Sequence, residues 1–279
     1  MTRPGQRERA ARFLELHRGP RILLLPNAWD AASARLFEEE GFPAIGTTSA
    51  GVAYSLGFPD GQQAPFPEMV AAIERIARAV QVSVTADIES GFGESAEEVG
   101  ENVRAVLEAG AVGVNLEDGR EGEDSLIPIS LHSEKIRSAR EAALAAGFAL
   151  VVNARTDVFL DAIGDPTTRF DEAVARANAY RHAGADCLFV PGVTEAATIE
   201  RLVRAIDGPL NVLAAAATPP ISELERLGVA RVSLGSGPMR ATLALLRRIA
   251  RELMDGGTYA TLTEGTIPYA ETNRLFART

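Results

Sequence analysis

Short apolar runs rich in β-branched residues alternate along the chain with longer segments whose apolar residues recur at helical spacing. Short apolar runs are typical of buried strands, and a period near 3.6 residues is typical of helices packed on one face. The pattern predicts eight strands, at residues 22–25, 44–48, 82–87, 112–117, 149–154, 186–190, 210–213 and 231–234.

A predicted helix follows each predicted strand, at residues 31–40, 67–80, 96–109, 133–146, 169–183, 195–206, 222–227 and 239–254. Strands separated by helices form a parallel sheet, and eight such units predict a closed (β/α)8 barrel of the TIM type. An open doubly wound sheet would normally carry a glycine-rich turn after its first strand. Residues 26–30, which follow the first strand here, contain no glycine, and this favours the barrel.

Two further segments flank the eight units. Residues 3–18 predict a leading helix, and residues 256–279 predict a C-terminal helical arm with scattered apolar side chains. We therefore expect one α/β barrel domain over residues 1–279, with the arm at 256–279. The apolar side chains of the arm would pack either on a second subunit or on the barrel of the same chain.

The overall composition changes this picture little. The chain has 279 residues, 46% hydrophobic and 24% charged, which is typical of a globular protein. Its net charge of -10 disfavours a nucleic-acid partner. A polar N-terminus and the lack of a long apolar run predict a cytoplasmic protein with no membrane segment. The single cysteine, Cys187, excludes an internal disulfide and is expected in the core.

Paired polar residues stand where three neighbouring predicted strands end. Side chains two residues apart on a strand point to the same side, so each pair is expected to face the mouth of the barrel, where active sites of this fold form. Taken singly, each residue is more typical of the start of a solvated loop. The pairs are Asp87 with Glu89, Asn115 with Glu117, and Asn153 with Arg155.

Three converging carboxylates, Asp87, Glu89 and Glu117, repel one another and need a cation or raised pKa values. Ligation by oxygen alone suits Mg²⁺, with Mn²⁺ also possible. Zinc is disfavoured because Cys187 lies within a strand and the histidines show no ligand spacing. We expect the three histidines at the surface or at helix ends; they are His17, His132 and His182.

Two features could bind an anionic substrate. Arg155 at the barrel mouth could form a bidentate pair with a carboxylate. Residues 47–51 read as a turn of small residues whose hydroxyls and amides could hold a carboxylate or enolate oxygen, or simply as a tight turn.

Together these segments resemble the isocitrate lyase/phosphoenolpyruvate mutase superfamily over most of the chain. The resemblance is carried by residues 47–51, 56–60, 87–93, 115–118, 153–157, Asn211 and 218–220. It implies that Asp60, with the three carboxylates above, lines a Mg²⁺ site, partly through water. It also implies a homodimer or homotetramer that exchanges its final helix between subunits.

The resemblance also implies roles for individual residues. The catalytic residues would be Thr48, Asp60, Glu117 and Arg155. The substrate would be bound by Thr48, Ser49, Ala50, Gly51, Asn153, Arg155 and Asn211.

The departures from the family pattern bear on the reaction. The true lyases of the superfamily carry a Cys-containing loop with Lys and His after the fourth strand, and the mutases carry Lys and Asn there. Residues 119–126 contain none of these types, which disfavours isocitrate or methylisocitrate cleavage by the usual mechanism. Leu213 and Ala214 stand where methylisocitrate lyases have Thr and Glu, so this side of the pocket should be less polar.

The function expected from these features is that of a Mg²⁺-dependent carbon–carbon lyase. It would act on a small 2-oxo acid or related dicarboxylate through a pyruvate-like enolate, with oxaloacetate decarboxylation the simplest case. Three alternatives stay open: phosphonopyruvate hydrolysis or mutation, a barrel that binds a 2-oxo acid without turnover, and a sugar-phosphate barrel that uses residues 235–238. Trp29 could line the mouth or cap the barrel.

Overall fold

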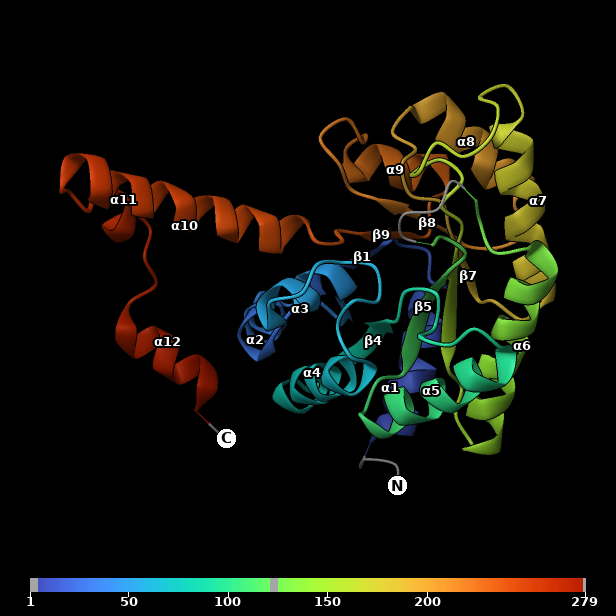
Figure 1. Ribbon diagram of the computed structural model, residues 1–279, viewed down its shortest axis with the longest axis horizontal. Helices are drawn as coiled ribbons and strands as arrows, with labels where there is room; N and C mark the ends of the chain where they lie inside the picture. Colours follow the sequence, from blue (N-terminus) through green and yellow to red (C-terminus); the bar gives the residue numbers. More distant parts are fainter. Residues whose placement is uncertain (1–4, 121–124, 278–279) are drawn as a thin grey trace.

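Parallel strands form the centre of the molecule (Figure 1). The computed structural model describes residues 5–120 and 125–277. Its nine-stranded sheet runs in the order β1-β9-β8-β7-β6-β5-β4-β3-β2. At the seam, β1 (Leu23–Leu25) pairs with β9 (Arg231–Ser233), and β2 (Asn27–Ala28) pairs with β3 (Ala44–Thr47). Because β1 and β2 are parts of one segment, the sheet forms a nearly closed barrel, as predicted.

The first predicted strand is thus continued by a second short strand beyond Pro26, which has no N–H to donate to a ladder. The other predicted strands are all present, within two residues at each end. Their bounds are β4 (Ser83–Asp87), β5 (Gly113–Glu117), β6 (Val151–Arg155), β7 (Cys187–Phe189) and β8 (Leu210–Leu213).

Helices surround this barrel in the predicted order. Their bounds are α1 (Gln6–Leu16), α2 (Ala31–Glu39), α4 (Phe66–Ala79), α5 (Ala96–Glu108), α6 (Ile129–Ala145), α7 (Arg169–His182), α8 (Ala196–Ala205), α9 (Ile221–Leu227) and α10 (Gly237–Gly256). Within the described part of the chain, no helix is both long enough and apolar enough to cross a membrane.

One helix was not predicted. The pattern at residues 47–51 predicts a turn, but α3 (Ser49–Leu56) begins there, with Thr48 as its N-cap. The Thr48 hydroxyl accepts a hydrogen bond from the amide of Gly51 at 3.3 Å. Small residues and a glycine hide the helical period from sequence reasoning, whereas capping by a threonine hydroxyl stabilises the first turn.

The leading helix α1 packs against the floor of the barrel. The Gln6 side chain donates hydrogen bonds to the carbonyls of Leu107 and Ala111 at 2.7 and 3.0 Å. Phe13 is fully buried, and a Cβ on Gly113 would lie 2.8 Å from its ring. Gly113 therefore leaves the room that the Phe13 ring occupies inside the barrel.

The C-terminal arm leaves the barrel along α10, which projects outward before α11 (Ala260–Thr263) and α12 (Tyr269–Phe276) fold back (Figure 1). Every residue of α10 is described, and Met239 alone is buried. Contact with the body of the chain resumes at α12, where Leu275 is buried and its carbonyl accepts a hydrogen bond from Arg35 Nε at 2.8 Å. The final helix thus touches α2 of the same chain, and α10 lies exposed.

We expect Gly113→Ala to lower the stability of the barrel by about 1–3 kcal/mol, because the added methyl group overpacks a filled interior. Its Cβ would lie 2.7 Å from Thr85 Oγ1 and 3.0 Å from the Val151 carbonyl oxygen. Gly237→Ala is the matched control, because nothing lies within 4 Å of a Cβ there. Thermal unfolding midpoints of the two variants check the prediction, and equal midpoints contradict it.

Candidate active site

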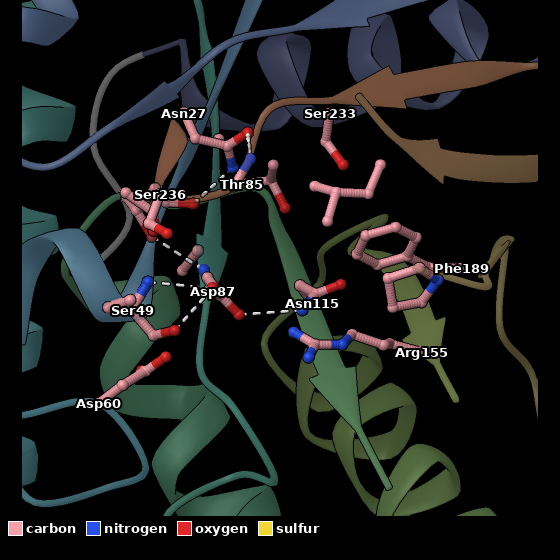
Figure 2. Close-up of a pocket in the computed structure, with 18 of the residues that line it drawn as sticks. Asn27, Ser49, Asp60, Thr85, Asp87, Asn115, Arg155, Phe189, Ser233 and Ser236 are labelled. Carbon is pink, nitrogen blue, oxygen red and sulfur yellow. Dashed lines mark hydrogen bonds between the residues drawn. The ribbon is translucent and has the colours of Figure 1, made fainter. Parts of the chain in front are cut away.

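A cavity of about 250 Å³ opens at the carboxyl ends of the strands (Figure 2). A second cavity of about 250 Å³ adjoins it and shares Ser49, Asp60 and Arg155 with it. The first is lined in part by Thr48, Ser49, Ala50, Asp87, Asn115, Phe189, Leu213, Ser236 and Arg240. The second is lined in part by Glu89, Glu117 and Asp157. The two cavities therefore form one site with two compartments.

Asp87, at the end of β4, is held by three hydrogen bonds. Its Oδ2 accepts from the Ser49 amide at 3.0 Å and from Ser49 Oγ at 2.8 Å, and its Oδ1 accepts from Asn115 Nδ2 at 2.9 Å (Figure 2). Asn153 Nδ2 in turn donates to Asn115 Oδ1 at 2.8 Å. The chain of bonds fixes the orientation of both amides, so the Asp87 carboxylate has one defined position.

Glu89 lies beyond the end of β4, with a backbone φ of 50°. The alternation of side chains along the strand therefore does not extend to it. It is 4% exposed, and its Oε2 accepts from the Gln62 amide at 2.6 Å. Burial, followed by the negative charges of Asp87 and Asp60, raises the pKa of Glu89 to about 8. The site without a cation therefore holds a proton at neutral pH.

Arg155 is paired with two carboxylates. Its Nη1 lies 2.6 Å from Glu117 Oε2, and its Nε lies 2.5 Å from Asp157 Oδ1. Burial nevertheless raises the pKa of Glu117 well above its usual range, even though Arg155 opposes that shift. The Arg155 guanidinium lies against the Phe189 ring, 5.8 Å from its centroid. Its position is thus defined by charge pairs and by the ring.

The donor set fits a hard divalent cation that keeps much of its hydration. The residues are four carboxylates, Asp60, Asp87, Glu89 and Glu117, and oxygen ligands suit Mg²⁺. No three acidic, histidine or cysteine side chains among the described residues lie close enough to hold an ion by themselves. Mg²⁺ commonly binds one or two carboxylates and completes its shell with water and substrate oxygens, so the arrangement is compatible with it.

Three residues expected to bind substrate are placed behind the cavity wall. Asn153 and Asn211 are fully buried, and neither is among the described residues that line the two cavities. Asn211 donates to Ser233 Oγ at 3.2 Å, as Asn153 does to Asn115. Gly51 is buried below Thr48 and Trp29. Each of the three supports a residue of the lining, and direct contact with substrate stays a prediction for them.

Trp29 packs beside α3, against the cluster that contains Val52, Ala53 and Met69. It is not among the described lining residues. Trp29 therefore supports α3. Neither of its two expected positions, lining the mouth or capping the barrel, included this contact.

Several lining residues are not predicted from the sequence, because no pairing or motif marks them. They are Asn27, Phe189, Arg231, Ser233 and Arg240. Ser236, which also lines the cavity, belongs to the turn at residues 235–238 that was considered for a phosphate. The Asn27 side chain closes the seam of the barrel: its Oδ1 accepts from the amides of Leu234 and Gly235 at 2.8 and 2.9 Å. The Gly235 amide is therefore not available to a phosphate group at residues 235–238.

The chain matches a known family over most of its length. Residues 13–254 match the family model described as phosphoenolpyruvate phosphomutase. The chain belongs to this family. An uncharacterized protein of Mycobacterium tuberculosis is 36% identical to it over 93% of each chain, and the 2-methylisocitrate lyase of Escherichia coli is 30% identical over 88% of this chain and 81% of that one.

Solved structures agree with this membership. A Burkholderia cenocepacia crystal structure has a TM-score of 0.90 and 38% identity, and covers 98% of this chain and 97% of that one. The crystal structure of 2,3-dimethylmalate lyase, a member of the same superfamily, has a TM-score of 0.83 and 25% identity, and covers 96% and 94%. The resemblance to the isocitrate lyase/phosphoenolpyruvate mutase superfamily, whose members include carbon–carbon lyases and mutases, is thus confirmed.

The loop that follows β5 is anchored at its base. Residues 121–124 of this loop lie outside the described residues. Its base is held together: the Ile127 amide donates to the Asp118 carbonyl at 2.8 Å, and Arg176 Nη1 donates to Asp118 Oδ2 and to the Ile127 carbonyl at 3.1 and 2.9 Å. Asp118 Oδ1 accepts from the Asp157 amide at 2.9 Å. The loop base is therefore linked to the carboxylate that pairs with Arg155.

The histidines are not positioned as ligands. His17 and His182 lie at the ends of α1 and α7, as expected. His132 lies in the first turn of α6, also at a helix end, and is fully buried against Tyr180. Cys187 is buried in β7, as expected.

We expect the stability of the cation-free protein to fall as pH rises through about 8. The folded-state pKa of Glu89 is raised, so its contribution is fully present below about 4.5 and is lost as the group ionises near 8. For one group the slope is at most about 1.4 kcal/mol per pH unit. Thermal unfolding midpoints between pH 6 and 9 in a chelator test this. Glu89→Gln should flatten the profile, and an unchanged slope in that variant would refute the assignment.

Proposed function

We propose that this protein is a Mg²⁺-dependent carbon–carbon lyase that acts on a small 2-oxo acid or related dicarboxylate. The observation that carries the proposal is the direct link between the first turn of α3 and Asp87, made by the Ser49 amide and hydroxyl. It brings the positive end of a helix and a cation-binding carboxylate to one wall of a cavity suited to a small acid. Relatives named 2-methylisocitrate lyase support the reaction class.

Asp60, Asp87, Glu89 and Glu117 would hold the cation. Bound Mg²⁺ would supply Lewis-acid stabilisation of the negative charge that develops on the 2-oxo oxygen. The residues of the chain would bind and orient the substrate. This must happen before a bond to the carbon atom next to the carbonyl is broken.

The first turn of α3 would bind the carboxylate and the enolate oxygen. Thr48, Ser49 and Ala50 line the cavity there. Hydrogen-bond donors aimed at a developing enolate are commonly worth about 3–4 kcal/mol each. Glu117 and Asp157 already balance the charge of Arg155. Arg155 would therefore orient the substrate by donating hydrogen bonds rather than by forming a further ion pair.

The opposite wall favours cleavage of a carbon–carbon bond. Phe189, Pro191 and Leu213 make this wall apolar. An apolar wall suits a neutral leaving group or an alkyl substituent better than a phosphonate. Loss of CO2 needs no acid, because the enolate can take its proton from water, and this agrees with the lack of a cysteine in residues 119–126. Decarboxylation of oxaloacetate is therefore the simplest reaction for the site.

A second candidate function is carbon–phosphorus chemistry on phosphonopyruvate. Ser236 and Arg240 line the first cavity and could bind a phosphonate. The match to the phosphoenolpyruvate phosphomutase family model also supports this reading.

We expect purified protein with Mg²⁺ to release pyruvate from oxaloacetate, and Asp87→Asn to reduce kcat/KM by about 10³-fold or more, since the change removes a cation-binding charge. Coupled assays of pyruvate, with parallel assays of phosphate release from phosphonopyruvate, measure both reactions. Asp171→Asn in the first turn of α7 is the matched control, because this carboxylate is exposed and outside the site. Phosphate release without pyruvate from oxaloacetate would favour the second candidate. No product from either acid, with Mg²⁺ and oxalate still bound, would favour a non-catalytic binder.

We also propose that the protein is a homo-oligomer whose subunits pack through the arm. Several apolar side chains of α10 are solvent-exposed in the single chain, among them Leu243, Leu246 and Leu253 at 42, 55 and 46%. A helix with an exposed apolar stripe is stable when another surface covers it. A second copy of the chain is the occupant that the family resemblance implies.

We expect the protein to elute in size-exclusion chromatography with light scattering at a multiple of 29.6 kDa. Leu246→Gln should shift it toward the monomer, because a buried leucine at an interface contributes about 1.5–3 kcal/mol. Arg251→Gln, which introduces the same side chain at an exposed polar position of α10, should leave the mass unchanged. A monomeric wild-type protein would refute the proposal.

A further inference from the structure

A buried arginine in the wall of the first cavity has no part in the chemistry described so far. Arg231 lies on β9 and is 2% exposed, yet it lines the cavity together with Thr85 and Asp87. Its Nη1 lies 3.4 Å from His17 Nε2, and its Nε, also buried, has no hydrogen-bond partner. Among the residues that the structure describes, no carboxylate forms an ion pair with Arg231.

The nearest titratable neighbours cannot neutralise this charge. His17 Nδ1 lies 2.8 Å from the Phe13 carbonyl and so carries the proton, which leaves Nε2 as an acceptor toward Arg231. Burial and the charge of Arg231 lower the pKa of His17 to about 3, so the ring is neutral. Burial raises the pKa of the Cys187 thiol to about 12, so it supplies no thiolate.

Asp87 does not neutralise Arg231 either. Its charge acts on Arg231 through space, but its carboxylate oxygens are taken up by Ser49 and Asn115. Burial lowers the pKa of Arg231 to about 10, which still leaves it charged at neutral pH. A buried, unpaired guanidinium is costly, and an anion at the same place would remove most of that cost.

Arg155, which lines the same cavity, differs from Arg231 in having carboxylate partners. Its charge is balanced by Glu117 at 2.6 Å and by Asp157 at 2.5 Å. Of these two arginines, Arg231 therefore keeps its charge available for a ligand. Thr85 also lines this cavity, and its Oγ1, buried without a hydrogen-bond partner, offers a hydroxyl donor there.

We propose that Arg231 and Thr85 make the deep end of the cavity a binding site for a carboxylate group, the far carboxylate of a dicarboxylate substrate. Thr85 precedes Asp87 by two residues on β4, which places it about 6.6 Å deeper along the strand. One end of the substrate binds at the first turn of α3 and the other at Arg231. This assignment of the far end rests on the proposed function, and it makes the enzyme selective for acids with two separated negative charges.

Isothermal titration with two non-reactive acids tests the site in the presence of Mg²⁺. Succinate is long enough to present a second carboxylate to the deep end, whereas oxalate is compact and binds at the α3 end alone. We expect Arg231→Met to weaken succinate binding by about tenfold or more, because a buried charge pair is lost. Oxalate binding should stay within about twofold, since it makes no contact with Arg231. Arg231→Lys, which keeps a positive charge, should retain part of the succinate affinity.

The unliganded Arg231→Met variant should unfold at a midpoint equal to or above that of the wild type, because an unpaired buried charge is replaced by an apolar chain of similar length. A crystal of wild-type protein soaked in bromide gives a second test that needs no variant. An anomalous peak within hydrogen-bond distance of Arg231 Nε supports the site.

Four outcomes overturn the inference. In Arg231→Met, these are equal losses of affinity for succinate and oxalate, or no loss of affinity for either acid. In the wild-type protein, they are no binding of succinate, or no bromide peak at the deep end. Failure of wild-type protein to bind oxalate with Mg²⁺ counts against the proposed function instead. In that case the bromide experiment decides alone whether Arg231 binds an anion.

Discussion

The parallel arrangement of the strands is the constraint on which the rest of the structure depends. Because every strand runs in one direction, every carboxyl end opens on one face, and the polar residues that end neighbouring strands meet there. Carboxylates that converge in this way repel one another. The site must therefore balance its own charge with hydrogen bonds, retained protons and cations, and each of its features can be understood in these terms.

The balance differs from one carboxylate to the next. Asp87 accepts three hydrogen bonds, two from Ser49 and one from Asn115. Glu117 and Asp157 share one guanidinium, that of Arg155. Glu89 has a single backbone donor and two carboxylates near it, and it keeps a proton to a pKa of about 8. The site is thus short of positive charge around Glu89, which is where a divalent cation would have its largest effect.

The same balance separates the two ends of the cavity. At the α3 end, carboxylates outnumber positively charged groups, and a cation would balance them. At the deep end, Arg231 leaves positive charge in excess, and its neighbours His17 and Cys187 are neutral. A dicarboxylate complements this polarity, with one end beside the cation and the other beside the guanidinium. Family membership fixes the scaffold, and the side chains that line the cavity set this distribution of charge.

The sequence by itself determined the order of strands and helices, the barrel and the family, because periodicity and local motifs are properties of adjacent residues. It also located Asp87, Glu89, Glu117 and Arg155, since polar residues at strand ends interrupt apolar runs. Only the tertiary structure decided which of these residues face the cavity. Asn153 lies behind Asn115, and Arg231 lies in the cavity wall without a carboxylate partner. Ion pairing, burial and the balance of charge depend on segments far apart in the chain, and no local pattern encodes them.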